Sequence, residues 1–174
     1  MQPLLYLIVD PMCSWCWGFR SAWQSFVREI PSSVTIKFLM GGLAPDSDEP
    51  MDTKTKTYIQ SAWRSRERYY EALQRAYFLD ARNPSDPETL IALAKEIGLD
   101  AVQFQEDLGS SVVQQTFREE LNQVRSLGVS GFPTVIWHRQ DKTDGNRLEV
   151  LSTGYTDADT LRERWHVLTN KLMR

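Results

Sequence analysis

The pattern of hydrophobic and polar positions predicts two strands and a helix in the first forty residues. Residues 4–9 form a continuous apolar run, and residues 34–40 alternate and are rich in β-branched side chains, so each segment predicts a strand. Between the two segments, apolar residues recur at helical spacing: Cys16, Phe19, Trp23 and Phe26. A strand, a helix and a second strand in this order predict a right-handed crossover between parallel strands.

The middle of the chain predicts helices only. Residues 43–53 are rich in Pro, Asp and Ser and predict a loop. Ser85 with Glu88 three residues later predicts a capping box, and Gly98 is placed to end that helix. The helices expected in this part of the chain span residues 54–82, 85–98, 101–108 and 111–127.

The period then changes back to that of strands. Residues 134–137 and 148–151 predict a hairpin across a polar turn at residues 141–146. Thr156 with Asp159 predicts the capping box of a last helix. The complete order is βαβ, a helical block, then ββα, so the fold class is α/β. Without the helical block this is thioredoxin topology.

We therefore expect one compact domain with an all-helical insertion between the two halves of a thioredoxin fold. Residues 1–46 form the βαβ half, residues 47–127 the insertion and residues 128–174 the ββα half. A chain of 174 residues is long enough to bury a core of its own.

Composition and charge exclude several classes of function. The net charge is −3 and the sequence pI about 5.4, so the broad basic face of a nucleic-acid-binding protein is not expected. The apolar run at residues 4–9 is too short to span a membrane, and it lacks the flanks of a signal peptide. We therefore expect a cytoplasmic protein that binds neither nucleic acid nor membrane.

Cys13-Ser14-Trp15-Cys16 contains both cysteines of the chain and lies where the first strand meets the first helix. The free N–H groups of a helix start stabilise a thiolate, the reactive form of cysteine. The spacing predicts a dithiol redox site in which Cys13 attacks a disulfide and Cys16 resolves the mixed disulfide. Zinc is the alternative, but it requires four ligands, and only His138 and His166 remain, far apart in sequence.

Two sequence blocks carry a resemblance to a known family. These are Asp10-Pro-Met-Cys-Ser-Trp-Cys-Trp-Gly-Phe19 and Gly128-Val-Ser-Gly-Phe-Pro-Thr134. Together they resemble the DsbA-like thioredoxin-fold family, and within it the FrnE-type cytosolic branch of predicted protein-disulfide isomerases. The resemblance implies that Pro133 is a cis-proline facing the CxxC motif. It also implies that the backbone of Phe132 pairs with an incoming peptide. Ser14 and Trp15 are the further candidates for contact with substrate.

The sequence departs from the family pattern at two places. Enzymes of this type often bury an acid six residues before the first cysteine, where this chain has Leu7; Asp10 is the nearby candidate to accept a proton. The helical insertion also looks short, as if a stretch near residues 62–70 were deleted.

These observations predict a thiol–disulfide oxidoreductase or protein-disulfide isomerase that acts on protein or peptide substrates as a monomer. No bound cofactor is required, and glutathione is a plausible redox partner. Two alternatives stay open. One is a glutathione-dependent transferase or isomerase on the related kappa-class scaffold, against which the CxxC pair argues. The other is a redox-regulated chaperone. The direction of exchange depends on the reduction potential relative to that of the compartment.

Overall fold

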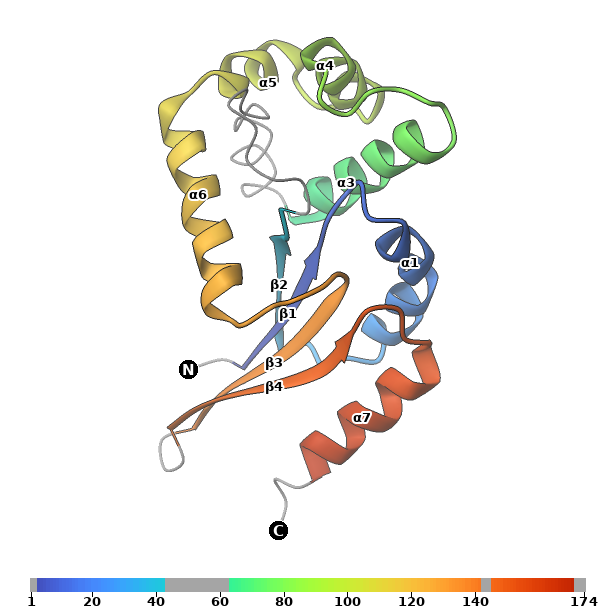
Figure 1. Ribbon diagram of the computed structural model, residues 1–174, viewed down its shortest axis with the longest axis vertical. Helices are drawn as coiled ribbons and strands as arrows, with labels where there is room; N and C mark the ends of the chain where they lie inside the picture. The colour runs from blue at the N-terminus through green and yellow to red at the C-terminus, as the bar shows by residue number, and fades with distance from the viewer. Residues whose placement is uncertain (1–2, 43–62, 142–144, 171–174) are drawn as a thin grey trace. The chain divides into compact units, whose positions relative to one another are not determined.

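The computed structural model describes residues 3–42, 63–141 and 145–170, and these contain one four-stranded sheet and six helices. The strands are β1 (Leu4–Val9), β2 (Thr35–Met40), β3 (Thr134–Asp141) and β4 (Gly145–Thr153). They lie side by side in the order β2-β1-β3-β4 (Figure 1). The predicted α/β class is therefore confirmed.

The register places the two halves of the sequence next to each other in the sheet. β1 and β2 are parallel, with Leu7 opposite Phe38, as expected for a βαβ unit. β3 runs antiparallel to β1, with Val135 opposite Leu7, and β4 runs antiparallel to β3. The start of β3 thus lies beside the end of β1, which leads directly to the two cysteines.

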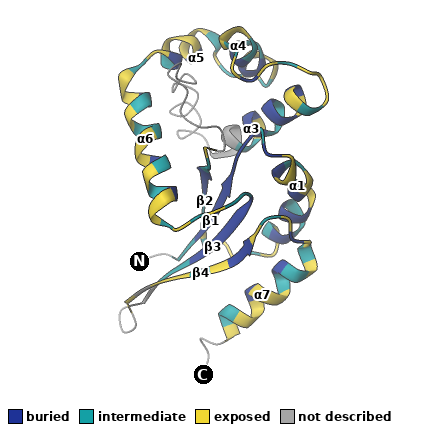
Figure 2. Ribbon diagram, in the orientation of Figure 1, coloured by how far each residue is buried: buried dark blue, intermediate teal, exposed yellow. Residues whose placement is uncertain are grey.

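One face of the sheet is covered by α1 (Ser14–Val27) and α7 (Ala158–Asn170). Trp165 of α7 packs edge-on against Trp137 of β3, with ring centroids 4.6 Å apart, and against Phe26 of α1 at 6.3 Å. All residues of β1 after Leu4 are buried, whichever face of the sheet their side chains point to. Figure 2 shows this as dark blue along β1 and the first half of β3.

The opposite face of the sheet holds a second cluster of buried side chains. Its members are Tyr6, Ile8, Leu39, Val124 and Ile136, with Phe132, Leu127 and Val129 packed against them. The strands supply most of this cluster, and the end of α6 (Ser111–Ser126) supplies Val124. Phe132 therefore has its ring packed against the core, and Pro133 follows it directly before β3.

The chain divides into two compact units. The sheet unit comprises residues 1–41 and 124–174, and the helical unit comprises residues 42–123. In the helical unit, α3 (Trp63–Phe78), α4 (Pro87–Glu96) and α5 (Ala101–Leu108) share one core. Tyr69 lies at its centre, with its ring 5.3 Å from that of Phe104 and its hydroxyl donating to the carbonyl of Leu90 at 3.1 Å. No helix in the described residues is both long and apolar enough to span a membrane.

Several element boundaries differ from the sequence prediction. The side chain of Asp86, not of Ser85, caps α4, and that of Asp157, not of Thr156, accepts the N–H of Thr160 at the start of α7. β3 and β4 extend into the polar residues predicted as a turn. The first nine residues of the helix predicted at 54–82 lie outside the described residues, as does part of the segment near residues 62–70.

Candidate active site

Cys13 occupies the N-cap position of α1. A turn connects β1 to this helix. In the turn, the N–H of Cys13 donates to the carbonyl oxygen of Asp10 at 3.2 Å. The Cys13 Sγ accepts the N–H of Cys16 at 3.4 Å, in the place where Ser or Asp usually caps a helix. Because this N–H and the positive end of the helix dipole both point at the sulfur, negative charge on the Cys13 Sγ is stabilised.

Cys16 lies in the first turn of α1 and faces the core. Only 2% of its surface is exposed, against 6% for Cys13. Burial raises the pKa of the Cys16 thiol well above its ordinary value, and a hydrogen bond with the backbone of Asp10 offsets part of this shift. The neighbouring Cys13 and the charge of Asp10 raise the pKa further. Cys16 is therefore a protonated thiol at neutral pH.

Phe132 and Pro133 lie against this pair although they are distant in sequence. The Cys13 thiol donates to the carbonyl oxygen of Phe132 at 3.6 Å, across a separation of 119 residues. The peptide bond between Phe132 and Pro133 is cis. The carbonyl of Pro133 accepts the N–H of Gly154 at 2.7 Å, which ties the loop to the end of β4. Three of the predicted site residues, Cys13, Phe132 and Pro133, are thus brought together.

With this geometry in place, comparison with known proteins identifies the family. The family model of the DsbA-like thioredoxin domain matches residues 51–164, more than half of the chain. The chain belongs to the DsbA-like thioredoxin domain family. The matched residues include Phe132 and Pro133, whereas Cys13 and Cys16 precede them. The predicted family is therefore confirmed, and the FrnE-type branch stays a prediction.

Two solved structures share the fold. A proposed protein disulfide isomerase from Nitrosomonas europaea superposes with a TM-score of 0.79 at 21% identity, over 98% of this chain and 99% of the other. The cytosolic disulfide reductase DsbM from Pseudomonas aeruginosa, solved with GSH, gives a TM-score of 0.64 at 18% identity, over 96% and 98% of the two chains. The predicted thioredoxin fold with helices between its halves is therefore confirmed.

One curated relative matches at the level of sequence. The ClpXP adapter protein SpxH of Halalkalibacterium halodurans is 22% identical over 193 aligned residues, which cover 86% of this chain. The match spans 63% of the length of SpxH, so this DsbA-like chain corresponds to less than two thirds of that relative.

The two residues between the cysteines of this DsbA-like site point outward. Ser14 is exposed, and the indole of Trp15 is 65% exposed, which is unusual for so large an apolar side chain. One turn further along α1, the guanidinium of Arg20 lies 4.0 Å from the centroid of the Trp17 ring. Ser14 and Trp15 therefore present an accessible surface beside Cys13.

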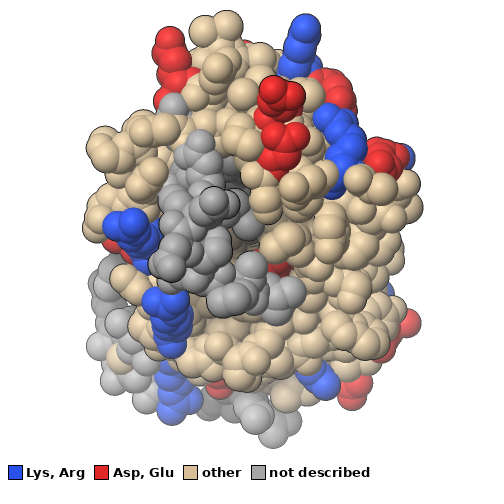
Figure 3. All heavy atoms as spheres, turned by 45° about the horizontal axis from the view of Figure 1, so that its top comes forward, with Lys and Arg blue, Asp and Glu red and all other residues tan. Residues whose placement is uncertain are grey.

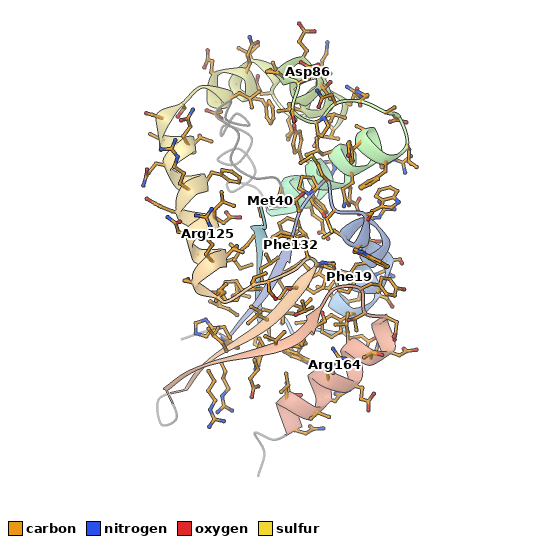
Figure 4. The ribbon with its side chains drawn as sticks, viewed as in Figure 1. Phe19, Met40, Asp86, Arg125, Phe132 and Arg164 are labelled. Carbon is orange, nitrogen blue, oxygen red and sulfur yellow. The ribbon has the colours of Figure 1, made fainter. Side chains whose placement is uncertain are left out.

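Gly41 is a residue of the site region that sequence reasoning missed. It follows β2, and a Cβ atom added to it would lie 2.2 Å from the ring of Phe132, a distance that no real Cβ atom tolerates. Figure 4 shows Phe132 beside the end of β2, where Met40 precedes this glycine. Gly41-Gly42 is visible in the sequence, but there it indicates only the end of a strand. The contact with Phe132 shows why one of the two positions requires glycine.

The structure shows the surroundings of Leu7 and Asp10, the two positions that the sequence analysis considered for a proton acceptor. Leu7 is buried in the middle of β1 and provides no acidic group. Asp10 is 5% exposed, and its carboxylate Oδ1 accepts the N–H of Met12 at 2.9 Å. A buried carboxylate therefore lies in the turn that leads into α1, the helix that begins with the two cysteines.

The described residues contain no cluster of three or more His, Cys, Asp or Glu side chains arranged to hold a metal ion. Basic and acidic side chains are intermixed on the face that Figure 3 presents and do not gather into a basic surface. The groups present at the site are therefore the two thiols of Cys13 and Cys16, the start of α1, and the exposed side chain of Trp15.

Proposed function

We propose that this protein is a thiol–disulfide oxidoreductase that exchanges disulfides with protein or peptide substrates through Cys13 and Cys16. The observation that carries the proposal is the position of the Cys13 Sγ. It accepts an N–H at the start of α1 and contacts the carbonyl of Phe132 next to Pro133. Family membership and the fold shared with a disulfide reductase support the same chemistry.

In the proposed reaction the Cys13 thiolate attacks one sulfur of a substrate disulfide. A bond forms between the Cys13 Sγ and that sulfur, and the other substrate sulfur leaves as a thiolate and takes up a proton. Cys16 then attacks the Cys13 Sγ and releases the second substrate sulfur. The substrate gains two electrons, and the Cys13–Cys16 dithiol becomes a disulfide.

The structure suggests how a substrate would be held during this exchange. Phe132 lies two residues before β3, where an extended peptide could pair with its backbone and thus be bound without much preference for sequence. The exposed Trp15 and Ser14 would contact side chains next to the substrate cysteine. In the same proposal, residues 47–127 are an insertion in a thioredoxin-like domain built from residues 1–46 and 128–174.

We propose the reductase or isomerase direction, with glutathione to regenerate the dithiol and no bound cofactor. A cytoplasmic location favours this direction, because the cytosolic thiol pool keeps exposed dithiols reduced. The DsbM structure was solved with GSH, which supports glutathione as the partner. We further propose that the protein acts as a monomer.

The proposal is tested by reduction of insulin in glutathione buffer. We expect Cys13→Ser to abolish activity, because no other thiol is positioned to attack. Cys16→Ser is the matched variant, and it should accumulate a mixed disulfide through Cys13. Near-wild-type insulin reduction by Cys13→Ser would contradict the proposal. Conjugation of glutathione to an electrophile would support the kappa-class alternative, and suppression of aggregation after both thiols are alkylated would support the chaperone alternative.

A further inference from the structure

Two backbone groups hydrogen-bond the Cys13 side chain and act on its charge in opposite directions. The N–H of Cys16 donates to the Cys13 Sγ at 3.4 Å, which favours the thiolate. The Cys13 thiol donates to the carbonyl oxygen of Phe132 at 3.6 Å. This second bond exists only while the sulfur carries its proton, so it favours the neutral thiol. The structure therefore combines a group that activates Cys13 with a group that restrains it.

The two backbone groups differ in whether a substrate can compete for them. The N–H of Cys16 belongs to the first turn of α1, and Cys16 is buried. The carbonyl of Phe132 lies two residues before β3, in the segment where the proposed exchange pairs an extended peptide with the backbone. The substrate sulfur has to reach the Cys13 Sγ, so the peptide approaches this carbonyl from the side on which the thiol donates. Even where both donors share the oxygen, each weakens the other, since both bind the same partial negative charge.

We propose that an extended substrate activates the thiol that attacks it. A peptide N–H takes the Phe132 carbonyl from the Cys13 thiol, and the sulfur then ionises more readily. This inference rests on the exchange reaction proposed above and adds its regulation by the substrate. The thiol proton passes to solvent, and the Cys13 thiolate bonds to one substrate sulfur. The other substrate sulfur leaves with the electron pair of the broken S–S bond and takes up a proton.

The same coupling acts in the other direction. The factor by which a peptide raises the ratio of thiolate to thiol is the factor by which ionisation of Cys13 tightens peptide binding. One neutral hydrogen bond corresponds to a factor of about 2 to 10. Cys16, on α1, and Asp10, in the turn before it, are titratable neighbours of Cys13, whereas residues 128–134, which carry Phe132, include no titratable side chain. Asp10 is unchanged in every variant compared below, so it does not produce the differences between them.

The first test compares peptide binding to Cys13→Ala and to Cys13→Ser. Serine keeps a hydroxyl that can donate to the Phe132 carbonyl, and alanine has no such donor. The probe is the insulin B chain with its cysteines blocked by iodoacetamide, so it has no sulfur to exchange, and calorimetry measures its affinity. We expect Cys13→Ala to bind it about 2- to 10-fold more tightly. Circular dichroism checks that both variants are folded, because alanine also removes the cap of α1. Equal affinities would overturn the inference.

The second test uses Cys16→Ser, in which Cys13 is the sole remaining thiol. The ultraviolet absorbance of the thiolate is titrated against pH with and without saturating blocked B chain. We expect the peptide to raise the ratio of thiolate to thiol by about 2- to 10-fold. Methylation of the backbone nitrogens of the probe, one at a time, should reveal the position at which this effect is lost. A ratio that the peptide leaves unchanged or lowers would overturn the coupling, as would a probe that binds none of the variants. Insulin reduction by Cys13→Ser judges the exchange reaction separately, so a failure of the coupling is distinguished from a failure of the proposed function.

Discussion

The contacts inside the sheet unit and those inside the helical unit join residues at very different separations along the chain. In the sheet unit, the contact that makes the site joins residues 119 positions apart, from Cys13 to Phe132. In the helical unit, the buried hydrogen bond from Tyr69 to Leu90 spans 21 positions. Helices α3, α4 and α5 pack against their neighbours in sequence, so a substitution in their core should not displace residues far away along the chain. The proposed thiol chemistry depends on the sheet unit, where the contact at the site joins distant parts of the chain.

Burial shifts the pKa of a side chain in each unit, but the shift has a different meaning in the two units. It raises the pKa of Cys16 in the sheet unit and of Tyr69 in the helical unit, by the same desolvation of the charged form. The Tyr69 hydroxyl donates to a backbone carbonyl and is a structural group. Cys16 lies one helical turn from Cys13, whose sulfur accepts its backbone N–H, so a partner for the proposed thiol exchange is present. A shifted pKa indicates function only where a partner for the reaction is present.

The largest expected effect on stability comes from the core of the helical unit. Phe104→Ala removes a ring that is completely buried against Tyr69, and we expect the free energy of unfolding to fall by about 3–5 kcal/mol. The rate at which Cys13 reacts with an alkylating reagent should stay as in the wild type under native conditions. Urea unfolding followed by circular dichroism, together with alkylation kinetics, measures both quantities.

Val102→Ala is the control for that variant, because Val102 lies on the same helix and is 69% exposed. It should leave both quantities unchanged. If Phe104→Ala changed the reactivity of Cys13 severalfold while the protein was still folded, the contrast between the two units would not hold.

A smaller loss of stability in the sheet unit should have a larger effect on activity. Gly41→Ala places a methyl group in the space of the Phe132 ring, so the ring must leave its packing. We expect the free energy of unfolding to fall by about 1–3 kcal/mol. We expect insulin reduction to slow about tenfold or more, since the carbonyl of Phe132 next to Cys13 shifts with the ring.

Gly131→Ala is the matched control in the loop that carries Phe132, because its added Cβ would meet Thr153 at 3.6 Å, an ordinary contact. It should lose little stability or activity. Full activity in Gly41→Ala would show that the position of the Phe132 ring is not required for exchange.

The sequence predicts the elements of this fold well where local periodicity decides them. The apolar run at Leu4–Val9 and the helix at Ala101–Leu108 have the predicted bounds. The caps at Asp86 and Asp157 were missed because Ser85 and Thr156, one position earlier, also fit a capping box, and both residue types can accept the N–H groups. Only the backbone at each helix start decides between them.

The candidate site was less accessible to sequence reasoning. The CxxC motif is local, and its place at a helix start follows from the neighbouring pattern. The approach of Phe132 to Cys13 depends on the pairing of β1 with β3. The residues of the helical unit separate these strands along the chain, so only resemblance to a family predicted the approach. The need for glycine at position 41 arises from a side chain more than ninety positions away, which no local pattern encodes.

The smallest expected effect concerns charge in the helical unit. Burial raises the pKa of Glu67 above its ordinary value, and the charge of Glu71, one helical turn away, raises it further. The folded state therefore holds this proton more tightly than the unfolded state. Its contribution favours folding at low pH and is lost as the pH rises through the ordinary value of 4.5 and then the folded-state pKa.

Glu67→Gln removes that charge, so it should raise the free energy of unfolding at pH 7 by about 0.2–0.5 kcal/mol, the scale of like-charge pairs on a helix. Near pH 3, where Glu67 is protonated in the folded and the unfolded state, the variant and the wild type should be equally stable. Urea unfolding at the two pH values measures the difference, with Glu119→Gln as a control at an exposed position in the middle of α6. The rate of Cys13 alkylation should not change at either pH, because Cys13 and Cys16 both belong to the sheet unit and Glu67 to the helical unit. A variant less stable at pH 7 than the wild type would show that the contacts of Glu67 outweigh its desolvation.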